Sequence, residues 1–250
     1  MTKIPTDLLA LRVAIRELSP ADREELAEWM LDSPDAGLAV AEAAPAYGSD
    51  GDRDRSLMTV EEYLNMAEGP TRYEYLAGHI YAMSAPLLRH ETIVNNLVYH
   101  LQHQLRGGPC RAFSSNARVR LIVNNDEVFY FPDAQIACGP FTEEMLDTSY
   151  LNNSRVVVEV LSPSTARIDR SEKAFNYRQL PSVQEILLIA QRTMELTVFR
   201  RSEQWKPQVL TRPQEVFESR AAAVSVALAD IYDGALSFDF KSSSDPATHL

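Results

Sequence analysis

The segment VVVEVLSPST, from Val156 to Thr165, places a single acidic residue, Glu159, inside an otherwise apolar run. Apolar residues at successive positions are typical of a strand at the centre of a sheet, where both faces are buried. An isolated charge in such a place is costly unless something compensates it. A bound cation would do so, and the segment therefore raises the hypothesis that Glu159 is a metal ligand. A structural ion pair with an arginine or a lysine is the alternative.

A second carboxylate, Asp133, follows Phe131-Pro132 at the start of the apolar run DAQIAC. Adjacent strands could bring Asp133 and Glu159 together. Magnesium is typically held by one or two carboxylates together with water, so this pair suits a hard divalent cation. Lys173, on the helix predicted after the strand of Glu159, and Glu74, in an earlier strand pair, complete a candidate site. A metal there would activate water and polarise a phosphoryl oxygen, while an ammonium would stabilise developing charge.

Each of these residues also has a plainer interpretation. Asp133 follows a proline and could cap a turn. Lys173 could be a solvated surface lysine, and Glu74 an outward strand residue that makes cross-strand pairs. His90 could contact a phosphate or a water, but a polar residue at the start of a helix is the favoured interpretation. Asp169 is predicted to cap the helix that carries Lys173.

The charge of the chain is strongly acidic, with a formal net charge of −11 over 250 residues. Residues 1–56 hold 12 acidic and 6 basic residues, so the excess is concentrated at the start. This composition argues against a protein that holds nucleic acid by bulk positive charge. Nucleic-acid binding would need a local basic groove, and the arginines expected to line a DNA path are Arg118, Arg120, Arg167, Arg170 and Arg178.

The cysteines and the N-terminus point to the cytoplasm. Cys110 and Cys138 are the only two cysteines and belong to no CxxC or zinc pattern. On the compartment argument we expect two reduced thiols, with a disulfide as the less favoured alternative. No run is long enough to cross a bilayer, and the acid-containing start lacks the pattern of a signal peptide. We therefore expect a cytoplasmic protein without a membrane partner.

Composition divides the chain into four parts. Residues 1–33 have the pattern of two helices, with a capping signal at Ser19. Residues 34–56 are rich in Ala, Gly, Pro, Ser and Asp and are predicted to be a linker. Residues 57–236 form the main domain, and residues 237–250 a polar tail. The helical appendage at residues 1–33 is a candidate for homodimer formation or for binding a protein partner.

The main domain alternates helical and strand patterns. Thr59 and Glu62 predict a capping box, and Ala77-Gly78 a turn between two strands. Residues 88–108 predict a long helix that ends at two glycines. Three further patterns are a hairpin through residues 124–126 that continues to residue 138, a helix stopped by Pro181, and a hairpin near residues 191–193. This order predicts an α/β (α+β) domain with a mixed sheet, and we expect a single sheet.

The strings YFPDAQIAC and VVVEVLSPSTARIDRSEKAFNYRQLPSVQEILLI resemble the signature of the Uma-two-type restriction endonuclease family, a branch of the PD-(D/E)XK nuclease superfamily. MTVEEYLNM and HETIVNNLVYHL resemble its N-terminal half, and the similarity spans residues 57–236. The resemblance implies a PD-(D/E)XK restriction-endonuclease-like mixed sheet flanked by helices, Mg²⁺ or Mn²⁺, and hydrolysis of DNA phosphodiester bonds. By position it makes Asp133 and Glu159 the metal-binding carboxylates, Lys173 the catalytic lysine and Glu74 an additional acid.

The chain departs from that pattern at two places. The superfamily lysine stands two residues after the glutamate, where this chain has Leu161, so Lys173 must supply the charge from the next helix. His79 follows Gly78 where the family usually has an acid. The lead hypothesis is a metal-dependent DNA endonuclease. The alternatives are a catalytically weak nuclease-fold interaction module that uses residues 1–33, and a hydrolase of RNA or of another phosphoester.

Overall fold

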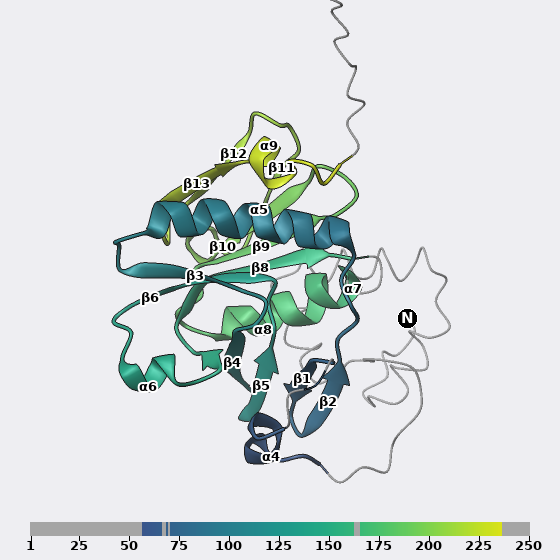
Figure 1. The fold of residues 1–250 in the computed structure, drawn as a ribbon, viewed down its shortest axis with the longest axis vertical. Helices are drawn as coiled ribbons and strands as arrows, with labels where there is room; N and C mark the ends of the chain where they lie inside the picture. Colours follow the sequence, from purple (N-terminus) through teal and green to yellow (C-terminus); the bar gives the residue numbers. More distant parts are fainter. Residues whose placement is uncertain (1–56, 67–68, 70, 163–165, 237–250) are drawn as a thin grey trace, which may run out of the picture.

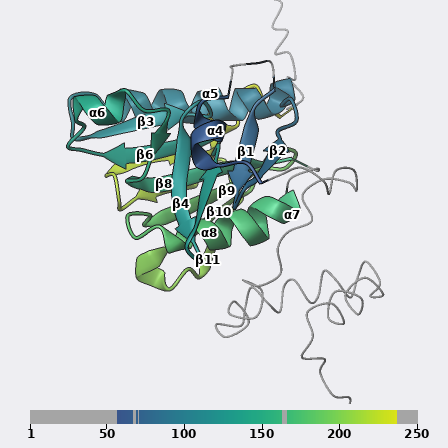
Figure 2. The same cartoon turned by 90° about the horizontal axis from the view of Figure 1, so that it is seen from below.

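The computed structural model describes residues 57–66, 69, 71–162 and 166–236. They form two mixed sheets, a separate hairpin and a small number of helices (Figures 1 and 2). The predicted appendage at residues 1–33, the linker at 34–56 and the tail at 237–250 lie outside these ranges. None of the helices within the described ranges is both long enough and apolar enough to cross a bilayer.

The first sheet has five strands, and two tight turns join neighbouring strands within it. Ala77 and Gly78 have φ of 47° and 92°, and Asn124 and Asn125 have φ of 51° and 69°. Glycine and asparagine tolerate this left-handed region best, so both predicted turns are confirmed. The strands in spatial order are β2 (His79–Ala82), β1 (Tyr73–Leu76), β5 (Asp126–Tyr130), β4 (Arg118–Val123) and β7 (Tyr150–Leu151).

The second sheet has six strands and carries Glu159 near its centre. Only its β8–β9 pair is parallel. The strands in spatial order are β11 (Pro207–Leu210), β10 (Leu196–Arg200), β9 (Glu185–Ala190), β8 (Ser154–Leu161), β6 (Ala134–Cys138) and β3 (Cys110–Ser114). β12 (Val216–Ser219) and β13 (Val224–Ala227) form the separate hairpin.

The expectation of a single sheet is wrong. The apolar run after Asn125 was expected to continue to Cys138 as one arm of a hairpin, but it divides between β5 in the first sheet and β6 in the second. The break falls at Phe131–Asp133. Pro132 has no N–H to donate to a strand ladder, so the chain leaves one sheet there and joins the other.

Helices cover the second sheet on one face, and the first sheet lies against its other face. α5 (Leu88–Leu105) packs Ile93, Leu97 and Leu101 onto the first of these faces, beside the hairpin and α9 (Leu228–Ile231). The opposite face packs against the first sheet and α8 (Ala174–Gln179). Figure 1 shows α5 and α8 on opposite sides of β8. Alternate β8 side chains therefore enter two different cores.

The remaining helices are short. α4 (Val60–Leu64) begins at the capping box predicted from Thr59 and Glu62. The described part of the segment between β8 and α8 contains α7 (Ala166–Ile168) and a π-helix, η1 (Asp169–Lys173). The other two are α6 (Glu143–Leu146) and the 3₁₀ turn η2 (Arg201–Glu203). Irregular π turns inside helices are frequently found at functional sites, which draws attention to Lys173.

The cysteine prediction is also wrong. Cys110 and Cys138 are bonded, and their Cα atoms lie 3.9 Å apart. The two residues face each other directly in the antiparallel β3–β6 pair, which brings their side chains within bonding reach. The sequence pattern did not show this because residues 110–114 were not recognised as a strand and β6 was assigned to another partner.

Candidate active site

Asp133 and Glu159 are brought together by strand register. Ala134 of β6 pairs with Val158 of β8, and the two strands are antiparallel. Asp133, which precedes Ala134, therefore faces Glu159, which follows Val158. The backbone N–H of Val160 donates to Asp133 Oδ2 at 2.6 Å. Asp133 and Glu159 are 9% and 3% exposed. The prediction that adjacent strands bring the two carboxylates together is confirmed.

Lys173 lies among carboxylates, inside the protein. Its Nζ atom is 2.8 Å from Glu74 Oε1, 3.4 Å from Glu159 Oε1 and 3.6 Å from Asp169 Oδ1. The residue is only 4% exposed, so the solvated-lysine interpretation is wrong. The π-helix that follows β8 therefore carries an ammonium back to the strand, although the position two residues after Glu159 is occupied by Leu161.

Glu74 connects the first sheet to this cluster. It belongs to β1 and is almost fully buried, so it is not the outward cross-strand residue considered above. Its Oε1 atom accepts the backbone N–H of Phe131 at 3.0 Å in addition to its contact with Lys173. Phe131 stands where the chain passes from β5 to β6, so Glu74 also holds the segment that leads into Asp133.

Two residues of the cluster were not recognised as site residues from the sequence. Tyr177 donates its hydroxyl to Glu159 Oε1 at 2.6 Å. Asp169 was predicted to cap a helix, but it is the first residue of η1, is buried, and pairs with Lys173. Asp169, Lys173 and Tyr177 recur every four residues, a spacing that places side chains on one side of a helix. That spacing was the available signal.

The electrostatics of the cluster are dominated by burial and by excess acid. Burial raises the pKa of Glu159; Lys173 opposes this rise, while Asp169, Asp133 and Glu74 add to it, and the pKa ends well above its ordinary value. For Lys173, burial lowers the pKa, but Glu159 and Glu74 outweigh it, so the pKa is raised and the ammonium stays charged. Burial, followed by the charge of Glu159, raises the pKa of Tyr177, which therefore remains a hydroxyl donor.

His90 extends the site to the start of α5. Its Nε2 atom lies 3.1 Å from Asp133 Oδ2, and the residue is buried. Burial lowers the pKa of the imidazole, but the hydrogen bond and charge of Asp133 outweigh it, and the pKa is raised overall. His90 is therefore more than a polar residue at a helix start, because it anchors the carboxylate of Asp133.

The donor set fits a divalent cation of the magnesium type. Three buried carboxylates, those of Glu74, Glu159 and Asp169, surround the single ammonium of Lys173. The carboxylates outnumber the ammonium, and this crowding, which also helps to raise the pKa of Glu159, favours a further cation. Within the described residues, no three His, Cys, Asp or Glu side chains are grouped as a metal cage. Magnesium does not require one, because it usually keeps several waters and takes one or two carboxylates. Asp133 and Glu159 are the two that face each other.

The arginines expected along a DNA path have mixed surroundings. Arg118 donates to Ser149 and lies over the rings of Tyr63 and Phe131, at 5.0 Å from each. Arg120 pairs with Glu127 and Arg170 with Glu195. Arg178 lies over the rings of Phe199 and Trp205. The side chain of Arg167 lies outside what the structure describes. Most of these arginines are thus engaged within the protein.

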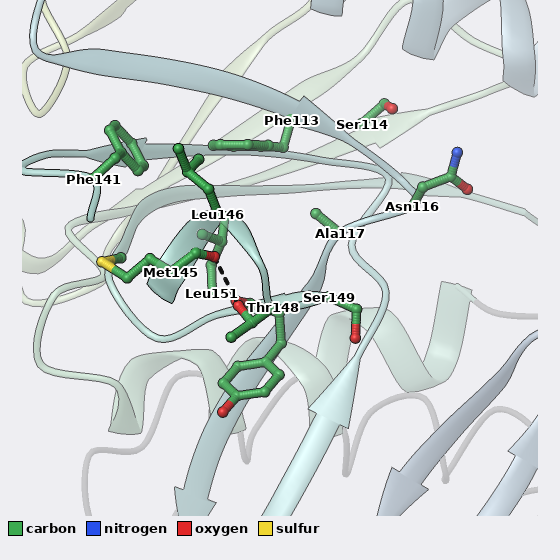
Figure 3. Close-up of a pocket in the computed structure, with 11 residues that line it drawn as sticks. Phe113, Ser114, Asn116, Ala117, Phe141, Met145, Leu146, Thr148, Ser149 and Leu151 are labelled. Carbon is green, nitrogen blue, oxygen red and sulfur yellow. Dashed lines mark hydrogen bonds between the residues drawn. The ribbon is translucent and has the colours of Figure 1, made fainter. Parts of the chain in front are cut away.

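A separate apolar cavity of about 260 Å³ lies along β3, between this strand, α6 and β7. Figure 3 shows Phe113, Met145 and Leu146 around it. No acidic or basic side chain lines it. It therefore offers no charged group for a metal or a phosphate, and the carboxylate cluster is the candidate site.

Comparison with known proteins matches most of the chain to a family. The family model described as "Uma2: Putative restriction endonuclease" matches residues 60–229. Two uncharacterized proteins of Synechocystis sp., slr1290 and sll1609, are 28% and 29% identical. The first alignment covers 71% of this chain and 92% of the relative, the second 54% and 76%.

The fold is also found in a crystal structure titled a "putative nuclease", from Anabaena variabilis. The TM-score is 0.59 at 20% sequence identity, and the match covers 72% of this chain and 99% of the other. At this sequence identity the similarity shows a shared fold and nothing about activity. The family model spans about two thirds of the chain, including Asp133, Glu159 and Lys173. The chain belongs to the Uma2 family of restriction-endonuclease-like proteins.

Proposed function

We propose that the protein is a metal-dependent endonuclease that hydrolyses DNA phosphodiester bonds on a PD-(D/E)XK-type site. The observation that carries the proposal is the position of Lys173, whose ammonium reaches Glu159 from η1 and would serve in place of the superfamily's proximal lysine. Membership of a restriction-endonuclease-like family and the facing pair Asp133 and Glu159 support it.

The chain's own residues divide the work. Asp133 and Glu159 would hold Mg²⁺ or Mn²⁺, which when bound supplies Lewis-acid and water-activating chemistry. Lys173 would stabilise the negative charge that develops on the phosphoryl oxygens. Glu74 and Asp169 would keep that ammonium in place, and Tyr177 and His90 would orient the two metal-binding carboxylates.

The test is cleavage of supercoiled plasmid and of circular single-stranded DNA with Mg²⁺, Mn²⁺ or EDTA. We expect metal-dependent cleavage by the wild type and a loss of about 100-fold or more in Asp133→Asn and Lys173→Met, since a metal ligand or a charge-stabilising group supplies several kcal/mol. Asp133→Asn keeps an oxygen that can accept the Val160 N–H, which limits its effect on folding. Arg106→Ala, at the far end of α5, is the control.

An absence of cleavage by the wild type with either metal would contradict the proposal. If metal then still binds through Asp133, an interaction module or a hydrolase of another phosphoester becomes the better hypothesis. The closed ion pairs around Lys173 are the feature that favours an inactive site, because they satisfy the ammonium without a substrate.

A further inference from the structure

A second hollow, of about 270 Å³, lies at the end of the second sheet and is lined by Leu87, Arg89, Gln191 and Arg192. Two of its four lining residues are arginines, and none is acidic. Gln191 directly follows β9, whose last residue, Ala190, pairs with Leu161 at the end of β8. In both views the N-terminal end of α5 and α7 lie at this same end of the molecule (Figures 1 and 2).

Gln191 is the unusual member of this cavity. It is 2% exposed, yet neither its Oε1 nor its Nε2 atom has a hydrogen-bond partner among the described residues. A buried amide without partners costs about 1–3 kcal/mol, and native proteins contain few of them. A ligand that accepts a hydrogen bond from Nε2 would remove part of this cost.

The N-terminus of α5 adds a further attraction for an anion. Leu87 is its N-cap residue, and no side chain caps the helix. The first N–H groups of an 18-residue helix and its dipole together favour a negative group at that end. Glu91, the acidic residue of the first turn, lies 3.7 Å from His90 Nδ1 and does not line the cavity.

We propose that this cavity is a phosphate-binding subsite that holds a phosphate of the DNA strand beside the scissile one. Two guanidinium groups offer the donor geometry that matches phosphate oxygens, and the amide of Gln191 and the helix end supply uncharged donors. The chain itself links the cavity to the candidate active site, because Arg89 directly precedes His90, which contacts Asp133. This assignment rests on the proposed endonuclease function.

The test measures binding of a labelled oligothymidylate to the full-length chain in EDTA over a series of salt concentrations. We expect the double variant Arg89→Ala, Arg192→Ala to bind roughly tenfold more weakly and to lower the salt slope by about 1. Gln191→Leu, which keeps size but removes the amide, is expected to weaken binding without changing the salt slope. Arg106→Ala removes a charge from the other end of α5 and is expected to bind as the wild type does.

The assay is repeated with three forms of the DNA: a circular strand, a linear strand, and a linear strand with a 5′-phosphate. They distinguish binding of an internal phosphate from binding of a terminal one. Equal losses on circular and linear strands identify an internal phosphodiester, which the assignment predicts. A loss confined to strands with a 5′-phosphate identifies a terminal phosphate and overturns the internal assignment. Unchanged affinity and salt slope in the double variant overturn the subsite but leave the endonuclease proposal standing.

Failure of the function is distinguishable from failure of the subsite. A wild type that binds none of the three DNA forms and cleaves none of them contradicts the endonuclease. In that case the protein is titrated with inorganic phosphate while the NMR chemical shift of the Gln191 side-chain amide is monitored. This measurement decides whether the cavity binds phosphate. A shift that is lost in the double variant supports phosphate binding, and no shift in the wild type overturns it.

Discussion

The ammonium of Lys173 lies 2.8 Å from the carboxylate of Glu74, although the two residues come from different layers of the molecule. Glu74 belongs to β1 in the first sheet, and Lys173 to the π-helix that follows β8 in the second. Their ion pair therefore connects the two sheets at the candidate site. Both side chains are almost fully buried, so removing Lys173 would leave the buried carboxylate of Glu74 without this cation.

Lys173→Met is expected to destabilise the metal-free protein. The substitution leaves three buried carboxylates without their cation, and breaking a buried ion pair typically costs about 3–5 kcal/mol of unfolding free energy. Urea denaturation in EDTA measures it. Arg155→Met, an exposed change on β8, is the control and should stay within about 0.5 kcal/mol. A loss for Lys173→Met no larger than that of the control would show that the cluster is already neutral.

Tyr177→Phe is expected to weaken metal binding. The phenylalanine keeps the ring but removes the hydroxyl that donates to Glu159 at 2.6 Å. Losing a partner that orients a ligand typically costs 10–100-fold in metal affinity, and we expect about 10-fold or more here. Calorimetric titration with Mn²⁺ measures it. Tyr232→Phe removes another buried hydroxyl, one that contacts Ala190 and Glu195, and should leave Mn²⁺ affinity unchanged. Equal Mn²⁺ affinities in the wild type and in both variants would show that Tyr177 does not support metal binding.

The stability of the metal-free protein is expected to fall as pH rises. The pKa of Glu159 is raised in the folded state, so the folded chain holds a proton that the unfolded chain has released above a pKa of about 4.5. The stabilisation from this proton is fully present below the pKa of Glu159 in the unfolded chain. As pH rises towards the pKa in the folded state, the free energy of unfolding falls by about 1.4 kcal/mol per pH unit. Glu159→Gln should remove the contribution of Glu159 to this slope and leave that of His90, whose pKa is also raised. Urea melts from acid to neutral pH in EDTA measure it, and parallel curves for the two proteins would contradict the assignment.

Replacing both Cys110 and Cys138 by serine is expected to lower the free energy of unfolding by about 2–4 kcal/mol, because the bond closes a loop between residues 28 positions apart. Denaturation with and without reductant measures the effect on the wild type, which should then match the double variant. Thiol counting on the unfolded, unreduced protein is the direct check. Two free thiols would show that the pair is reduced in the isolated protein.

Local patterns predicted much of the site. An acid within an apolar run indicated Glu159, and the position of Asp133 at the start of a neighbouring strand indicated its partner. The turns at Ala77-Gly78 and at Asn124-Asn125 were predictable because few residues adopt positive φ without strain. The signal for Tyr177 was also local, since it follows Lys173 by four residues.

The sequence by itself thus determined most of the strands, the two turns, the long helix and the identity of the candidate carboxylates, because each depends on residue periodicity or on the conformational preference of single residues. Only the tertiary structure decided that β5 and β6 lie in different sheets, that Cys110 meets Cys138, and that Glu74 reaches Lys173. It also decided the surroundings of Gln191. These depend on which strands become neighbours, and neighbours distant in the chain are chosen by the packing of whole faces rather than by any local pattern.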